Sequence, residues 1–369
     1  MKTTYLVTPN FPPDICGIGD YASFLYQNLE ENNFNTHIIT FSNDKQQDKK
    51  IHFIKIDDKK SITAWLNCLK NPSEVNTIII QYEPYSFSKV GIPLYLIYIF
   101  LILKIKGYKI SIMFHEVATR LYIANPKKII VSLLQLFIAY FLTALSSVRT
   151  TSTSFNAKQL KPFKFELLPI SSNFTKKNTT IHSSENQAII GCFANRVDDF
   201  FATVIDQILQ KKLGLVYLIG KQNKANDEVW GKHDFYNKEG LFLTGTLSPD
   251  GIEGIFNKLT LFIHMEKIDA KGRGGASLKN GTLAAALNWG LPVITSKGDM
   301  TDEDFLQHNK NIFFVNNSFS VDDWVNAIEY LSNNDVVKTQ IKQNALLFYQ
   351  QNLSWPVITK KYISLFGNV

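Results

Sequence analysis

The stretch from Lys271 to Ser296 constrains the fold of this chain more than any other, because it joins three physically different pieces. A glycine-rich basic loop, Lys271–Lys279, is followed by an alanine-rich segment, Asn280–Trp289, and then by a short apolar run, Leu291–Thr295. Apolar residues recur at helical spacing in the middle piece, and alanine favours a closely packed helix. The order of loop, helix and buried strand predicts one unit of an α/β protein.

The same loop is a candidate anion site. The N–H groups at a helix N-terminus have no partner within the helix, and the helix dipole favours a negative charge beside them. Glycines let the backbone approach a ligand closely, while basic and hydroxyl side chains add charge and hydrogen bonds. The candidate phosphate-binding residues are Lys271, Gly272, Arg273, Gly274, Gly275, Ser277, Lys279, Asn280, Gly281 and Thr282. A flexible surface loop on an ordinary αβ unit is the alternative interpretation.

The stretch resembles the donor-site segment of GT-B glycosyltransferases, in particular the retaining, nucleotide-sugar-dependent enzymes of the family 4 type. In that family a glycine-containing loop leads into a helix and then into a Gly-x-Pro-Val-Ile strand, here Gly290–Ile294. The family's usual pair of glutamates would fall at Ser277 and Ala285, and neither is acidic. A subset of such enzymes carries a Ser and a Gly-Thr-Leu instead, as Ser277 and Gly281–Leu283 do. The glutamate that usually contacts the donor ribose is therefore missing.

Length and composition limit the class of protein. A chain of 369 residues suggests two domains of ordinary size, and 45% hydrophobic with 19% charged residues is typical of a folded protein. The three cysteines, Cys16, Cys68 and Cys192, lie far apart, which argues against a disulfide framework or a zinc site and fits a reducing cytosol. The start of the chain, 1–8, is typical of a strand, so we expect no secretory signal there.

The charge is unevenly distributed. Residues 1–180 hold 21 Lys/Arg against 12 Asp/Glu, a net charge of +9, whereas residues 181–369 hold 18 against 20, a net charge of −2. This asymmetry predicts that the first half contacts something anionic. No nucleic-acid motif with interleaved aromatic residues is visible, so we predict an anionic membrane surface or a lipid pyrophosphate rather than nucleic acid. A lysine-rich surface that only keeps the protein soluble is the alternative.

Apolar runs alternate with helical patterns along the first half, and this order predicts a parallel sheet. The expected strands are 5–8, 37–41, 51–56, 77–81, 109–114, 149–154 and 166–169. Residues that follow such strands lie at the carboxyl edge of the sheet, where α/β proteins build their sites.

The loop after the first strand, Pro9–Gly19, contains Gly17 and Gly19 but no G-x-G-x-x-G fingerprint. We expect Asp20 to cap a helix that runs to Leu29. The loop resembles the first loop of GT-B enzymes, which lies in the interdomain cleft near donor and acceptor. The resemblance implies donor contacts from both glycines and an acceptor-side place for Asp20, and a plain turn is the alternative.

Two more strand ends carry candidate residues. The turn Gln81–Pro84 is similar to one in GT-B enzymes, which implies an acceptor-side place for Glu83; the alternative is that Glu83 is solvated or caps the next segment. His115 and Glu116 follow the strand 109–114, and a histidine there can donate hydrogen bonds to a sugar hydroxyl or phosphate. Many family 4 enzymes have such a pair facing the transferred sugar, which implies catalytic roles for both. A structural histidine, with a glutamate that only orients loops, is the alternative.

Two long apolar segments follow one another in the first half. The run Val90–Leu103 is too short to cross a membrane comfortably, and Lys104, Lys106 and Lys109 follow it. Such a helix either lies on a bilayer surface or covers the sheet. Polar residues interrupt the second segment, Ile129–Val148, so a transmembrane helix is possible but not preferred, because a span here would separate two halves that the strand pattern needs in one sheet.

The polar segment 176–186 is the expected linker, and a second strand–helix series follows it. The expected strands are 188–193, 215–219, 261–264, 291–295 and 312–315, and the expected helices are 250–259, 280–289, 321–331, 336–350 and 354–366. No internal repeat of solenoid period is evident.

Retaining GT-B enzymes often have an arginine after the first strand of this series and a lysine shortly afterwards, which together hold the donor pyrophosphate. Arg196 fits the first place, and guanidinium suits bidentate contact with phosphate. Phe201 occupies the second place, so Lys221 is the candidate for the second charge. Glu266, which follows the strand 261–264, completes the candidate donor residues. A surface ion pair with one of the two aspartates that follow is the alternative role for Arg196.

These patterns predict an α/β chain of two Rossmann-like, doubly wound domains facing a cleft, the GT-B arrangement. The expected domains are an acceptor-side domain 1–178 and a donor domain 187–352, followed by a closing helix 353–369 that crosses back onto the first domain. The Ser354-Trp355 start of that helix is similar to the family's last helix.

The resemblance implies a cytoplasmic glycosyltransferase, in peripheral contact with the inner membrane face, that acts in surface polysaccharide synthesis. Its co-substrate would be a nucleotide-sugar, its acceptor a glycan or lipid-linked hydroxyl, and its reaction retaining, with no metal and no bound cofactor. Two alternatives belong to other classes. One is a sugar-nucleotide 2-epimerase of the same fold, and the other is a non-catalytic scaffold subunit that keeps the fold.

Overall fold

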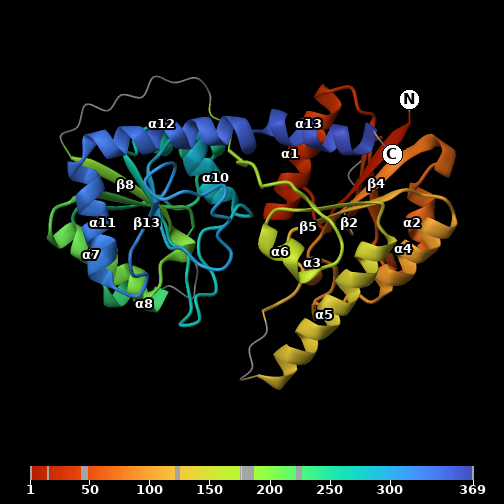
Figure 1. Ribbon diagram of the computed structural model, residues 1–369, viewed down its shortest axis with the longest axis horizontal. Coiled ribbons are helices and arrows are strands. Elements are labelled where there is room, and N and C mark those ends of the chain that lie inside the picture. Colours follow the sequence, from red (N-terminus) through yellow and green to blue (C-terminus); the bar gives the residue numbers. More distant parts are fainter. Residues whose placement is uncertain are drawn as a thin grey trace. The chain divides into compact units, whose positions relative to one another are not determined.

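The computed structural model describes residues 2–14, 16–42, 49–120, 125–174, 176, 187–221 and 227–367 (Figure 1). The chain divides into two compact units. Unit 1 comprises Met1–Ile170 and Trp355–Val369, and unit 2 comprises Ser171–Ser354. The chain thus enters unit 2 before the expected domain end at 178, and the hydroxyl of Ser171 lies 3.2 Å from that of Tyr349 in the same unit. Apart from Lys176, the expected linker 176–186 lies outside the described residues.

Unit 1 is built on a parallel sheet with the order β3-β2-β1-β4-β5-β6-β7. Its strands are β1 Thr3–Val7, β2 Thr36–Phe41, β3 Ile51–Ile54, β4 Val75–Tyr82, β5 Ile110–Phe114, β6 Val148–Thr151 and β7 Glu166–Leu167. Every residue of β1 and β5 is buried, as expected for strands covered by helices on both faces. Because all pairs are parallel, the carboxyl ends of these strands meet at one edge.

The helices of unit 1 are α1 Gly17–Glu31, η1 Ile56–Asp58, α2 Ile62–Cys68, η2 Pro72–Glu74, α3 Pro84–Phe87, α4 Tyr95–Ile105, α5 Pro126–Leu145, α6 Ser154–Gln159 and α13 Trp355–Gly367. The last helix, α13, packs on α1 (Figure 1). The Trp355 ring stacks on Phe24 at 5.6 Å, and the hydroxyls of Tyr21 and Tyr362 lie 3.4 Å apart. The expected return of the closing helix to the first domain is therefore confirmed.

Two expected helix starts in unit 1 are wrong. Helix α1 begins at Gly17, with Cys16 at its N-cap position and no side-chain cap, so Asp20 lies in its first turn instead of capping it. The expected helix 90–103 begins only at Tyr95. Pro93 precedes that start, and its ring, which lacks an N–H, explains why the helix does not extend further back.

Unit 2 has a parallel sheet with the order β10-β9-β8-β11-β12-β13. Its strands are β8 Ala188–Phe193, β9 Gly214–Ile219, β10 Leu241–Leu243, β11 Leu261–His264, β12 Val293–Thr295 and β13 Phe313–Phe314. The edge strand β10 was not expected from the sequence. The order reverses between β8 and β11, and such a switch point is where doubly wound proteins bind ligands.

The helices of unit 2 are η3 Ala194–Arg196, α7 Asp199–Gln210, α8 Asp227–Lys232, α9 Pro249–Phe256, α10 Gly281–Asn288, α11 Val321–Asn333 and α12 Asp335–Asn352. Helix α10 confirms the expected helix 280–289 to within a residue at each end. Gly290 has φ +67°, the left-handed conformation expected just past a helix end. Both sheets with their helices confirm the α/β class and the two doubly wound domains.

Candidate functional site

Residues from neighbouring strand ends of unit 2 meet around the carboxylate of Glu266. Its Oε1 accepts a hydrogen bond from Asn280 Nδ2 at 2.6 Å and lies 3.4 Å from Arg196 Nη1. Its backbone carbonyl accepts a hydrogen bond from the hydroxyl of Ser296 at 2.6 Å. Arg196 follows β8, Glu266 follows β11, and Ser296 follows β12, so the sheet order brings these residues together. Three of the predicted site residues are thus neighbours.

Arg196 forms an ion pair with Glu266 and not with Asp198 or Asp199, which was the alternative. Asp198 accepts from the N–H of Phe201 and caps α7, and its other oxygen lies 2.5 Å from Lys267 Nζ. The Arg196 side chain is 45% exposed, against 19% for Glu266. The guanidinium therefore keeps donors that a ligand in solution can reach.

His264 belongs to the same group, although the sequence patterns did not single it out. Its Nε2 lies 3.7 Å from Glu266 Oε1, and its Nδ1 lies 3.2 Å from the hydroxyl of Thr295. Burial lowers the pKa of His264 to about 4, so the imidazole is neutral at pH 7. The signal was present in the sequence, because His264 ends a buried strand as His115 follows one.

The N-terminus of α10 is capped by the side chain of Asn280. Its Oδ1 accepts from the N–H groups of Thr282 and Leu283, and from the hydroxyl of Thr282 at 2.6 Å. These two N–H groups are therefore already occupied. Within the described residues, the N–H groups of Ser277, Leu278 and Gly281 donate to no acceptor. An anion at this helix start would meet these three donors and the positive end of the helix dipole.

The glycine loop before α10 is held in place by close backbone contacts. Gly275 has φ +84°, and a Cβ there would lie 2.4 Å from the backbone nitrogen of Gly298. A Cβ on Gly274, at φ +127°, would lie 2.0 Å from the carbonyl oxygen of Lys267. No larger residue fits either place, so this loop needs glycine for its own packing as well as for ligand approach.

The remaining predicted cations of unit 2 lie elsewhere. The guanidinium of Arg273 forms an ion pair with Asp269, with an Nη2–Oδ2 distance of 2.5 Å and a hydrogen bond from Nε at 2.6 Å. The Arg273 hydrogen bond holds the pKa of Asp269 at about 2. Lys221 is exposed in the segment after β9. The structure thus brings Arg196, Glu266 and Asn280 together, while the donor contacts of Arg273 and Lys221 stay predictions.

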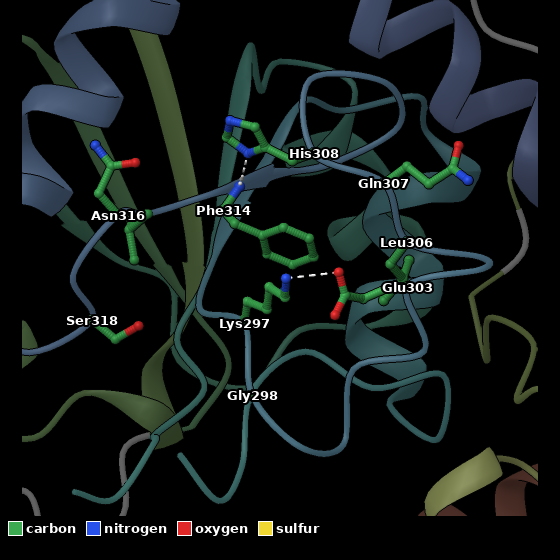
Figure 2. Close-up of a pocket in the computed structure, with 10 residues that line it drawn as sticks. Lys297, Gly298, Glu303, Leu306, Gln307, His308, Phe314, Asn316 and Ser318 are labelled. Atoms are coloured by element: carbon green, nitrogen blue, oxygen red, sulfur yellow. Dashed lines mark hydrogen bonds and ion pairs between the residues drawn. The ribbon is translucent and has the colours of Figure 1, made fainter. Parts of the chain in front are cut away.

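A pocket of about 670 Å³ opens at the carboxyl ends of β12 and β13. Figure 2 shows the ion pair of Lys297 with Glu303, at 2.7 Å, and the N–H of Phe314 donating to His308 Nδ1. Gly298, on its lining, also packs on the glycine loop. This pocket is therefore a neighbour of the Glu266 group along the same edge of the sheet.

In unit 1, His115 lies directly after β5, as predicted. Its Nε2 is 2.7 Å from Gln81 Oε1, and its ring contacts Tyr21 edge-on at 5.3 Å. Its carbonyl oxygen accepts from Asn156 Nδ2. Burial lowers the pKa of His115 to about 4, so it is a neutral, firmly positioned imidazole at pH 7. Glu116 follows it and is partly exposed.

The other candidates of unit 1 are placed as follows. Glu83 accepts from the N–H groups of Tyr85 and Ser86 and caps α3, so the capping alternative is confirmed, and its acceptor contact stays a prediction. Gly17 and Gly19 form the first turn of α1, where a Cβ on Gly19 would lie 2.8 Å from a carbonyl oxygen. Burial raises the pKa of Asp20 in the same turn.

No protein-family model matches the chain, and no curated protein matches it. Several solved structures are similar over nearly the whole chain. Anabaena HepE in complex with UDP and glucose has a TM-score of 0.68, with 12% identity over 100% of both chains. TarM has a TM-score of 0.74, with 11% identity over 99% of both chains. WaaG, a glycosyltransferase involved in lipopolysaccharide biosynthesis, has a TM-score of 0.64, with 10% identity over 99% of this chain and 100% of its own.

A Listeria monocytogenes protein named as a UDP-N-acetylglucosamine 2-epimerase is also similar, with a TM-score of 0.61 and 10% identity over 100% of this chain and 98% of its own. All these identities are low, so the likenesses show the fold alone. That fold is the GT-B fold, with two Rossmann-like domains, as the sequence predicts.

Proposed function

We propose that the chain is a glycosyltransferase that moves a sugar from a nucleotide-sugar donor to an acceptor hydroxyl. One observation carries the proposal. The start of α10 presents the N–H groups of Ser277, Leu278 and Gly281 without acceptors in the described part of unit 2, and the exposed Arg196 belongs to the same carboxyl edge of the sheet. Fixed donors of this kind suit a diphosphate, and a nucleotide-sugar carries one.

In this mechanism the diphosphate lies on the start of α10, with the hydroxyl of Ser277 and the loop around Arg273 and Gly275 beside it, while the hydroxyl of Thr282 donates to Asn280 and helps to hold the cap. These donors stabilise the negative charge that grows on the nucleotide as it leaves, and they need no reorganisation because the protein already holds them. The site lacks the family's glutamate pair, and we assign the ribose contact to Glu266, whose carboxylate is fixed by Asn280 and Arg196.

Unit 1 supplies the side of the reaction where the sugar is transferred. His115 contacts the sugar as a neutral group that Gln81 and Tyr21 hold in one orientation. Glu116 adjoins it as the second catalytic residue. We assign donor contacts to Gly17 and Gly19 and acceptor-side roles to Asp20 and Glu83. Positioning of this kind lowers the barrier because the reacting groups start close to their reactive arrangement.

We propose a lipid-linked glycan as the acceptor, in the synthesis of a surface polysaccharide at the cytoplasmic face of the inner membrane. The basic character of unit 1 supports it, because its residues hold 21 Lys/Arg against 12 Asp/Glu. Among the structural neighbours, WaaG is involved in lipopolysaccharide biosynthesis. Retention of the anomeric configuration, independence from metal ions and the absence of a bound cofactor belong to the same proposal, through the family resemblance.

Product analysis tests the proposal. The intact chain is incubated with nucleotide-sugars labelled in the sugar, with and without a membrane lipid extract, and the products are separated. We expect label in a lipid-linked product and a free nucleotide, with His115→Ala lowering the rate at least about 100-fold. Free epimerised nucleotide-sugar without acceptor would contradict transfer and favour the epimerase. Donor binding without any turnover would instead indicate a non-catalytic scaffold.

A further inference from the structure

Unit 1 carries an apolar face that the described residues leave open. We call it the α4–α5 strip. Its members are all more than one-third exposed, and they are Leu94, Tyr98, Leu101, Ile105, Ile130, Leu133, Phe137, Tyr140 and Phe141. Leu94 is the N-cap residue of α4, and the others lie on α4 and α5, mostly three or four residues apart; these two helices lie side by side (Figure 1). Soluble surfaces rarely gather so many large apolar side chains, so the strip indicates a binding surface.

Helix α5 has hydrogen-bonding side chains on its buried face, next to the buried Ile138, Ala139 and Leu142. The buried Ser132 hydroxyl donates to the carbonyl of Thr119 at 2.6 Å. The buried Gln135 amide donates to the carbonyl of Gly91 at 3.0 Å and accepts from the N–H of Thr119 at 2.6 Å. These bonds hold α5 on unit 1, while Ile130, Leu133, Phe137, Tyr140 and Phe141 of the same helix are exposed.

The hydrogen bonds of Ser132 and Gln135 favour an α5 that lies on a bilayer over one that spans it. Among the described residues, α5 is the one helix long and apolar enough to cross a membrane. Leaving unit 1 to do so would break the hydrogen bonds of Ser132 and Gln135 and place both polar groups in hydrocarbon. A helix that stays docked and lies in the interfacial region keeps those bonds and covers its outer face with lipid.

The charges around the strip match an anionic surface. From Pro84 to Phe165 the sequence holds 11 Lys/Arg and a single acidic residue, Glu116, a net charge of +10. Lysines flank both ends of the strip, and they are Lys104 in the last turn of α4, Lys106 and Lys109 after it, and Lys127 and Lys128 at the start of α5. The ammonium of Lys104 lies 3.5 Å from the carbonyl of Ala144, so the two helices end side by side and run in parallel.

We propose that the α4–α5 strip docks on an anionic lipid bilayer, with its apolar side chains in the interfacial region and its lysines at the lipid phosphates. A second copy of the chain suits the strip less well, because an isologous contact would bring the same lysines together. Helix α5 follows β5 and His115 in the chain and packs against β5. Docking here would hold unit 1 near a lipid-linked acceptor. The benefit of docking therefore rests on the proposed function.

Vesicle flotation of the full chain tests the proposal. The vesicles are phosphatidylcholine alone and phosphatidylcholine mixed with phosphatidylglycerol. We expect binding mainly to the anionic vesicles, weakened by salt. The double variant Lys127→Gln/Lys128→Gln should lower the partition coefficient on anionic vesicles about five-fold for each lysine removed. The double variant Leu133→Gln/Phe137→Gln should lower it at least about tenfold.

A matched control variant makes the same kind of substitution, two exposed apolar residues to glutamine, on unit 2. Val336→Gln/Leu347→Gln removes two exposed apolar side chains from α12, and it should bind vesicles as the unchanged chain does. Equal losses in the strip and control variants, or no binding of the unchanged chain, would overturn the proposal. Bound protein that resists extraction with alkaline carbonate would indicate a spanning helix and also overturn it.

Two further measurements distinguish docking on lipid from self-association and from nucleotide binding. Sedimentation velocity without lipid should show a monomer; a dimer that the strip variant dissociates, with no effect on vesicle binding, would assign the strip to a second copy. Stabilisation of the chain by nucleoside diphosphates in solution should be the same in the strip variant. If no nucleoside diphosphate stabilises the unchanged chain although it binds vesicles, the proposed function is overturned and membrane docking is not. If a nucleoside diphosphate stabilises the chain but vesicles do not bind it, membrane docking is overturned and the proposed function is not.

Discussion

At the scale of single residues, the chain keeps neutral imidazoles where α/β proteins build their sites. His115 follows β5 in unit 1 and His264 ends β11 in unit 2, and both are buried. Burial lowers the pKa of each to about 4, below the ordinary value near 6.5. A neutral ring can exchange hydrogen bonds with its neighbours without adding a charge to the site.

These histidines predict how stability depends on pH. Between pH of about 6.5 and 4 the unfolded chain binds protons at these positions and the folded chain does not. The free energy of unfolding should therefore fall as the pH drops through this window, by about 1.4 kcal/mol per histidine for each unit of pKa difference. Thermal unfolding followed across the window measures this. His115→Gln should flatten the dependence, and an unchanged slope in that variant would count against the assignment.

At the scale of elements, the sequence predicted those parts that depend on local pattern. Parallel strands, helix α10 and the returning helix α13 follow from periodicity and strand spacing, or from resemblance, and the structure has them. Strand β10 was not predicted because it is three residues long, and one of them, Phe242, is 43% exposed. The start of α1 was misplaced because Asp20 is a good capping residue, and only tertiary packing decides where that helix begins.

The candidate site also has parts that depend on local sequence and parts that depend on the sheet order. The glycine loop and the start of α10 were predictable, since both are contiguous in sequence. The Arg196–Glu266–Asn280 group was not predictable as a group, because it depends on β8 and β11 being neighbours in the sheet. The ion pair of Arg273 with Asp269 was also not predicted, although the two residues are four apart in a loop. His264 was overlooked despite its place at a strand end.

The cap of α10 yields a prediction at the element scale. Asn280 and Asn334 both cap a helix with their side chains: Asn280 accepts from two N–H groups of the first turn of α10, and Asn334 accepts from one, that of Val337 in α12. Replacing either with alanine should lower the free energy of unfolding by about 1 kcal/mol. Only Asn280→Ala should also weaken donor binding, because it alone holds Glu266. Thermal unfolding with and without nucleoside diphosphate compares the two, and equal effects on ligand stabilisation would contradict a role for the cap in the site.

At the scale of the whole molecule, charge follows the two units. Unit 1 has a net charge of +9 from 21 Lys/Arg and 12 Asp/Glu, and unit 2 a net charge of −2 from 18 and 20. Unit 1 also carries the apolar α4–α5 strip, while unit 2 carries the open N–H groups of α10. The net positive charge and the exposed apolar strip therefore belong to the same unit.

Calorimetric titration measures whether unit 2 binds a nucleoside diphosphate at the start of α10, as we propose. UDP, GDP, CDP, ADP and dTDP are titrated into the intact chain, into Arg196→Gln, and into Arg273→Gln as a matched arginine already paired with Asp269. We expect one nucleotide to bind clearly, with affinity reduced at least about tenfold in Arg196→Gln and less in Arg273→Gln. Binding of no nucleotide, or full affinity in Arg196→Gln, would contradict the account.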